Sequence, residues 1–121
     1  MKKKFLLLIL LVGTLATAAF SARTALAQNA PQRIVITAKR FSYSPGEITL
    51  KKGQPVVLVL NSQDVAHGLK LRDFKINLKV KAGGTAEVQF TPEKTGDFIG
   101  HCSVFCGSGH GSMKLKLHVV G

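Results

Sequence analysis

From residue 32 onward, apolar and polar positions alternate over short segments that glycine and proline separate. This period of two predicts half-buried β-strands, because successive side chains of a strand point to opposite faces. Residues 56–60 form instead an unbroken apolar run, which is typical of a central strand buried on both faces. The predicted strands cover residues 34–38, 41–43, 48–50, 56–60, 76–80, 86–90, 97–102 and 113–119.

Strands this short and this closely spaced predict an all-β domain, a Greek-key β-sandwich or barrel of seven or eight strands. Outside residues 1–27, no window of eleven residues keeps a helical period. Gly83-Gly84 lies between two alternating segments and predicts a β-hairpin that joins residues 76–80 to 86–90. Because no repeat or linker interrupts the pattern, we expect residues 28–121 to form one domain.

The first 27 residues have a different pattern. Three lysines follow Met1, residues 5–20 are apolar except for one glycine and two threonines, and Ala25-Leu26-Ala27 precedes a polar residue. This order is typical of a secretory signal peptide, and the apolar run is shorter than the ~20 residues of a membrane-spanning helix. We expect cleavage after Ala27 and an exported, periplasmic product; the alternative is an uncleaved leader that anchors the domain on the periplasmic side.

Charge narrows the choice of partner. The chain carries 17 basic and 6 acidic residues, and its 45% hydrophobic content excludes a disordered polybasic chain. Without the leader, 13 basic and 6 acidic residues leave a formal charge of +7 on 94 residues. Several lysines occupy outward strand positions and predict a protein partner with an acidic face, and no nucleic acid; they would equally keep a small sandwich soluble. These lysines are Lys75, Lys79, Lys81, Lys114 and Lys116.

The chemically distinctive segment runs from residue 101 to residue 113 and is rich in glycine. It contains Cys102, then Cys106 four residues later, His110 after four more, and Met113 after three more. Two thiols, an imidazole and a thioether form a soft ligand set that suits copper better than magnesium, calcium or manganese. The interleaved glycines let the backbone turn tightly enough to point several side chains inward.

Other interpretations of this segment remain open. Cys102 and Cys106 would also suit a disulfide in an exported protein, and Met113 would suit the core. A structural zinc site would use both cysteines with His110 and one more histidine. A mononuclear blue-copper site needs one cysteine, two histidines and a weak methionine ligand, which leaves Cys102 without a role. Two copper ions that share both thiolates would use every one of these residues.

The order Cys, three residues, Cys, three residues, His, two residues, Met resembles the binuclear CuA motif of cytochrome c oxidase subunit II and nitrous oxide reductase. Asp64-Val65-Ala66-His67, which begins 38 residues before Cys102, resembles the Asp-Val-x-His tetrapeptide of the same family. The resemblance spans roughly residues 32–120 and implies a cupredoxin fold with two copper ions. It implies that Cys102 and Cys106 bridge both ions, that His67 and Met113 complete one, and that His110 and the main-chain carbonyl of Val104 complete the other.

The resemblance also implies one-electron transfer in a respiratory chain, with a c-type cytochrome or a terminal oxidase or reductase as partner and no catalytic residue in this chain. Three departures favour a stand-alone exported protein: a leader replaces two transmembrane helices, Val104 replaces a frequent acidic residue, and tryptophan is absent. Two alternatives remain: a CuA subunit of a membrane cytochrome c oxidase, associated with the membrane through a partner or its leader, and a copper-binding or delivery protein without a redox role.

Two further histidines lie outside the motif. His118 falls on the lysine side of the last strand, so we expect it to face solvent. His101 should point away from Cys102, its neighbour along a strand, and is a candidate for tuning the metal site from outside the ligand set.

Overall fold

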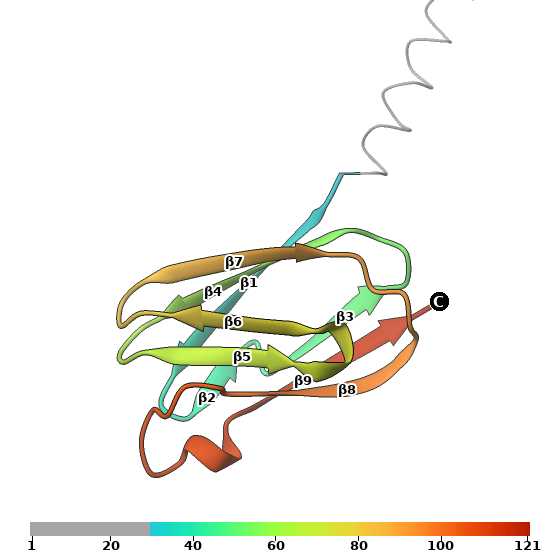
Figure 1. Ribbon diagram of the computed structural model, residues 1–121. Helices are drawn as coiled ribbons and strands as arrows, with labels where there is room; N and C mark the ends of the chain where they lie inside the picture. Colours follow the sequence, from blue (N-terminus) through green and yellow to red (C-terminus); the bar gives the residue numbers. More distant parts are fainter. Residues whose placement is uncertain (1–29) are drawn as a thin grey trace, which may run out of the picture. The chain divides into compact units, whose positions relative to one another are not determined.

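The computed structural model describes residues 30–121, so the predicted leader lies outside the described residues. Within this part of the chain, nine strands form two sheets, and no helix is long and apolar enough to cross a bilayer (Figure 1). The strands are β1 (Gln32–Lys39), β2 (Ser42–Ser44), β3 (Glu47–Lys51), β4 (Val56–Ser62), β5 (His67–Leu71), β6 (Ile76–Val80), β7 (Thr85–Phe90), β8 (Gly96–His101) and β9 (Lys114–Val120). Two short 3-10 turns complete the elements, η1 (Arg72–Phe74) and η2 (His110–Ser112).

The two sheets enclose the apolar core. One sheet has the strand order β2-β1-β4-β7 and the other the order β3-β9-β8-β5-β6, with β1 parallel to β4 and β3 parallel to β9. Alternating side chains of facing strands, such as Ile36, Leu58 and Leu117, are fully buried between the sheets. The predicted all-β sandwich is therefore confirmed, and so is the central position of β4.

The structure adds one strand that the pattern did not predict. Strand β5 (His67–Leu71) pairs with β6 along its whole length, and it raises the count to nine in the described residues. Its sequence opens with histidine and glycine, and only Leu69 and Leu71 supply alternation, which is too little for a reliable signal. This missed strand carries His67.

The predicted hairpin at Gly83-Gly84 is wrong. Strand β6 pairs with β5 and β7 pairs with β4, so the chain crosses here from one sheet to the other. The turn itself is tight, because Gly84 donates to the carbonyl of Lys81 at 2.9 Å and Gly83 has a φ of 67°. The apolar residues of β6 and β7 face each other across the sandwich, and their alternation is the same as in a hairpin.

His118 lies on the outer face of β9, as expected, between two carboxylates. Its ring nitrogens contact Asp97 on β8 at 2.5 Å and Glu47 on β3. The hydrogen bond to Asp97, and then the one to Glu47, raise the pKa of His118 above its ordinary value. A protonated His118 therefore ties three neighbouring strands together.

Replacing His118 with glutamine is expected to destabilise the protein mainly at acidic pH. A raised pKa means that the stabilisation is fully present below the ordinary value of about 6.5 and is lost as pH rises through the folded-state pKa. Thermal unfolding of both proteins from about pH 5 to pH 9 measures this, and the difference in Tm should shrink towards alkaline pH. A difference in Tm that does not vary with pH would contradict the assignment.

Candidate metal centre

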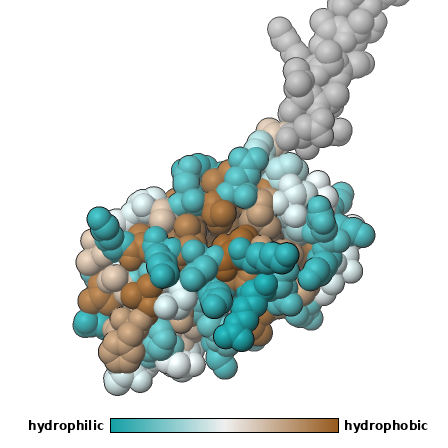
Figure 2. Space-filling view, in the orientation of Figure 1, coloured by the Kyte–Doolittle hydropathy of each residue, from teal (hydrophilic) through white to brown (hydrophobic). Residues whose placement is uncertain are grey.

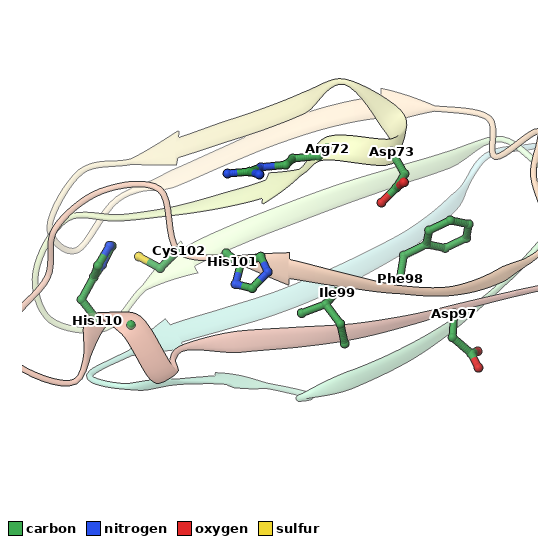
Figure 3. Close-up of a pocket in the computed structure, with 9 residues that line it drawn as sticks. Arg72, Asp73, Asp97, Phe98, Ile99, His101, Cys102 and His110 are labelled. Carbon is green, nitrogen blue, oxygen red and sulfur yellow. The ribbon is translucent and has the colours of Figure 1, made fainter.

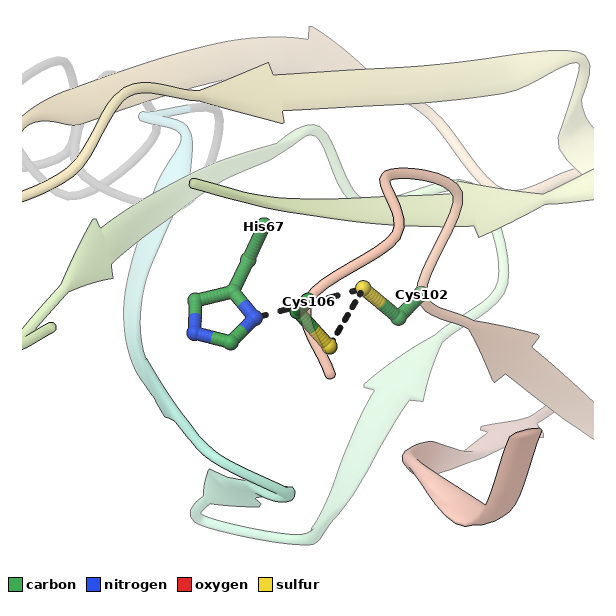
Figure 4. Close-up of side chains that lie close together, drawn as sticks. All are labelled: His67, Cys102 and Cys106. Atoms are coloured by element: carbon green, nitrogen blue, oxygen red, sulfur yellow. Dashed lines mark hydrogen bonds between the residues drawn. The ribbon is translucent and has the colours of Figure 1, made fainter. Parts of the chain in front are cut away.

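The two cysteines lie side by side in the interior, at the end of the sandwich where β8 leads into the long connection to β9. Their sulfurs are 3.8 Å apart, both residues are buried, and both thiols are free (Figure 4). Cys102 points inward because it continues the alternation of β8, in which Phe98 and Gly100 also face the core. The paired sulfurs form the middle of the candidate site.

His67 reaches the sulfurs from the neighbouring strand. It is the first residue of β5 rather than a loop residue, it is fully buried, and its Nδ1 is 4.0 Å from the sulfur of Cys102. The ligand atoms of His67, Cys102 and Cys106 all lie within 4.8 Å of one another. This spacing is compact enough for one metal site to involve all three residues.

The remaining predicted ligands lie beside the same sulfurs. Nδ1 of His110, in η2, is 3.6 Å from the sulfur of Cys106, and the thioether sulfur of Met113 is 3.9 Å from it. The thiol of Cys102 donates to the carbonyl of Val104 at 3.1 Å. The structure thus brings all six residues of the predicted set together, with two further donors beside each cysteine; their roles as ligands stay a prediction.

Asp64 orients His67 and was not assigned a role from the sequence. Its Oδ1 accepts from Nε2 of His67 at 2.6 Å, which leaves Nδ1 facing the sulfurs. Its Oδ2 accepts from the backbone N–H of Arg40 at 2.8 Å, and this hydrogen bond, together with that to His67, lowers the pKa of Asp64 to about 2. A carboxylate behind a ligating imidazole is a common way to fix the ring.

The turn between β1 and β2 contacts both segments of the candidate metal centre, and no local pattern indicated it. Arg40, which also contacts Asp64, donates through Nε to the carbonyl of Cys106 at 3.1 Å. The ring of Phe41 fills the space beside Gly109, where a Cβ atom would come within 2.5 Å of it. Arg40 and Phe41, which we call the clamp, therefore fix residues 102–113, which we call the cysteine loop, relative to the segment that carries His67.

Burial makes the thiol of Cys106 a poor acid. Desolvation, and then the hydrogen bond with Cys102, raise the pKa of Cys106 to about 11, and Arg40 partly opposes this shift. The buried hydroxyl of Tyr43 donates to the carbonyl of Gly68 at 2.5 Å, and burial followed by the nearby Cys102 raises its pKa well above the ordinary value. A soft metal ion that binds these sulfurs would therefore displace the thiol protons, and metal binding would release them to the solvent.

His101 lies outside the cluster. It is exposed at the end of β8 and lines an open groove of about 810 Å³, with Cys102 and His110 at one end and Asp97 at the other (Figure 3). Among the described residues, no hydrogen bond joins His101 to the predicted ligands. Its role in tuning the site stays a prediction.

The donor set fits copper. Two thiols, two imidazoles and a thioether in a buried cluster are soft donors, whereas magnesium and calcium take hard oxygen ligands. In a structural zinc site, four nitrogen or sulfur ligands complete the coordination, and Met113 would not be used.

Known proteins are similar to this chain in sequence. The chain matches the family described as Cupredoxin-like domain over residues 6–113. It is 31% identical over 91 residues to cytochrome c oxidase subunit 2 of Thermus thermophilus, which is 74% of this chain and 67% of that protein. It is also 35% identical over 88 residues to the nitrous-oxide reductase of Ralstonia nicotianae. This match covers 69% of this chain but only 14% of that reductase.

Solved structures agree on the fold. The periplasmic domain of subunit II of cytochrome oxidase (CoxB) of Bradyrhizobium japonicum superposes with a TM-score of 0.69 at 23% identity, over 75% of this chain and 85% of that one. A mixed disulfide intermediate between thioredoxin-like TlpAs and subunit II of cytochrome c oxidase gives a TM-score of 0.63 at 22% identity, over 75% and 82%.

Proposed function

The chain belongs to the Cupredoxin-like domain family, and from this premise we propose that it is an exported copper protein that holds a binuclear CuA centre and carries single electrons. The observation that supports this most strongly is the arrangement around Cys102 and Cys106, where two further donors flank each sulfur. Two sulfurs in the middle of such a set suit two metal ions that share both thiolates. A mononuclear site would leave part of the set unused.

The protein's own contribution is a rigid, buried ligand frame. When bound, copper supplies the one-electron couple. Asp64 holds the ring of His67, and Arg40 holds the backbone of Cys106, so the ligands have little freedom to move when the charge changes. Restricted ligand movement keeps the reorganisation energy of electron transfer small.

A redox titration of the copper-loaded protein tests the function. The proposal requires about two copper ions per chain and one reversible single-electron step, with the initial spectrum recovered after a full cycle. A delivery protein without a redox role would instead release Cu(I) to a competing chelator and show no reversible couple. That outcome would overturn the electron-transfer proposal and leave copper binding intact.

The similarity to subunit 2 of the Thermus oxidase favours a second candidate, in which the chain is the CuA-bearing subunit of a membrane oxidase. The ligand frame would be the same, and the difference would lie in the partner. Co-purification of the native protein with a haem-containing membrane protein would support the subunit, whereas recovery alone in the periplasmic fraction would support the carrier.

We expect the exported form to begin at Gln28, after cleavage behind Ala27. The leader lies outside the described residues, so this proposal rests on its sequence pattern and on the periplasmic origin stated for the CoxB domain. The intact mass of the exported protein decides it. A full-length species that remains in the membrane fraction would contradict the soluble carrier and favour an anchored domain.

Without copper, Cys102 and Cys106 are expected to oxidise to a disulfide in an oxidising compartment, since their sulfurs are only 3.8 Å apart. The two thiols would lose two protons and two electrons to an oxidant and form one S–S bond. Thiol titration of the metal-free protein should fall from two groups to none on exposure to air, and copper uptake should return after reduction. Two titratable thiols that persist in air would contradict this expectation.

A thioredoxin-like protein would be a suitable reductant. A protein of similar fold, subunit II of a cytochrome c oxidase, forms a mixed disulfide with the thioredoxin-like protein TlpAs. We infer that a similar protein keeps these thiols reduced until copper arrives.

A further inference from the structure

The outer face of the five-stranded sheet carries two lysines and a histidine in register. Lys70 on β5 lies directly opposite His101 on β8, and His101 lies directly opposite Lys114 on β9. Directly opposed residues of antiparallel strands have Cβ atoms about 5 Å apart. We call Lys70, His101 and Lys114 the basic row; Lys70 is half-buried, and the other two are exposed.

The basic row lacks compensating charge. Among the described residues, neither Lys70 nor Lys114 forms an ion pair, and the acidic residues Asp97 and Glu47 on the same face are bonded to His118 towards the other end. Lys79 on β6, opposite Gly68, adds a further cation near Lys70. Ion pairing within the described residues therefore does not account for the lysines of the row.

The row lies immediately above the candidate metal centre. His101 precedes Cys102, Lys114 follows Met113, and the alternation of the strands sends His101 and Lys114 outward and the two donors inward. A partner that contacts the row would therefore be separated from the donors by a single layer of sheet.

The surroundings of the row suit a protein partner. The end of the groove beside it is lined by Arg72, His101 and Ile99, which is 43% exposed, whereas Asp73 and Asp97 line the end away from the cysteines (Figure 3). Figure 2 shows hydrophilic side chains spread over the face that includes β5 and β6, with apolar atoms visible between them. Polar residues around a partly apolar centre are typical of transient protein interfaces.

We propose that the basic row and the adjoining groove are the docking surface for the chain's redox partner, a protein that carries a cluster of carboxylates around its own redox centre. The proposal rests on the electron-transfer function argued above and identifies the face that this function uses. The competing surface is the tip of the cysteine loop, where Phe105 is 78% exposed and its ring centroid lies 5.6 Å from that of His110.

Charge reversal tests the docking surface. The test variant is the double mutant Lys70→Glu and Lys114→Glu, and the matched control is Lys51→Glu and Lys52→Glu, which makes the same charge change at the end of β3 away from the site. Stopped-flow electron exchange of the copper-loaded proteins with an acidic c-type cytochrome should show an association rate at least about tenfold lower for the test variant. The control should stay within about threefold, and the salt dependence of the rate should flatten only in the test variant.

A second readout does not depend on copper. Amide NMR shifts of the reduced, metal-free protein, titrated with the same acidic cytochrome, should change on β5, β8 and β9 around the basic row. Shifts confined to residues 103–110, equal rates for both variants, or binding to anionic lipid vesicles instead of the cytochrome would each overturn the proposal. Failure of electron exchange with intact NMR binding would instead count against the proposed function and leave the docking surface standing.

Discussion

Replacing Cys102 with serine is expected to lower the copper content from two ions per chain to one. The sulfur of Cys102 lies 3.8 Å from that of Cys106 and is the sulfur beside His67 and the carbonyl of Val104, so its loss removes one of the two proposed bridges. The remaining set is complete for a mononuclear site, with one cysteine, two histidines and one methionine. We therefore expect one retained ion and a changed visible spectrum.

Metal analysis and an absorption spectrum of the loaded variant measure this. The matched control is Ser103→Ala, next along the loop, whose hydroxyl contacts Asn77 rather than the site. The control should keep two ions and the original spectrum. An unchanged copper content in the Cys102 variant would show that this thiol was never a ligand.

The second large effect concerns Gly109 and Gly111, which flank His110. A Cβ atom on Gly109 would lie 2.5 Å from two ring atoms of Phe41, whereas a Cβ atom on Gly111 meets nothing within 4 Å. Gly109→Ala must therefore push the cysteine loop away from the clamp and displace His110, at a cost of about 1–3 kcal/mol in stability. Gly111→Ala should change stability by no more than about 0.5 kcal/mol.

Chemical denaturation of the metal-free proteins and copper titration of both variants compare the two changes. Gly109→Ala should unfold at lower denaturant concentration and bind copper more weakly than the parent protein. Gly111→Ala should match the parent in both measurements. Equal behaviour of the two variants would show that the contact with Phe41 does not hold the loop.

The candidate ligands that the structure brings together could be picked out from the sequence because most of them follow one another in a single short loop. Spacing along 12 residues is a local property, and the tetrapeptide ending at His67 matched the same family by its own residues. The alternation of residues 113–119 is equally local, and it separates the buried Met113 from the exposed Lys114 that follows it. Local patterns therefore indicated the candidate residues and most of the strands.

The residues that the sequence did not reveal act over long separations. Arg40 lies 66 residues before Cys106, and Tyr43 lies 25 residues before Gly68, so nothing local marks their contacts. The wrong hairpin at Gly83-Gly84 has a related cause, since alternation specifies an inward face but not the sheet to which a strand belongs. The clamp around the site was for this reason visible only in three dimensions.

The electron paramagnetic resonance spectrum of the copper-loaded exported protein, residues 28–121, tests the binuclear centre most directly. One unpaired electron shared equally over two copper nuclei gives a seven-line hyperfine pattern, and we expect this pattern. A four-line pattern with a single intense blue absorption band would show mononuclear copper and contradict it.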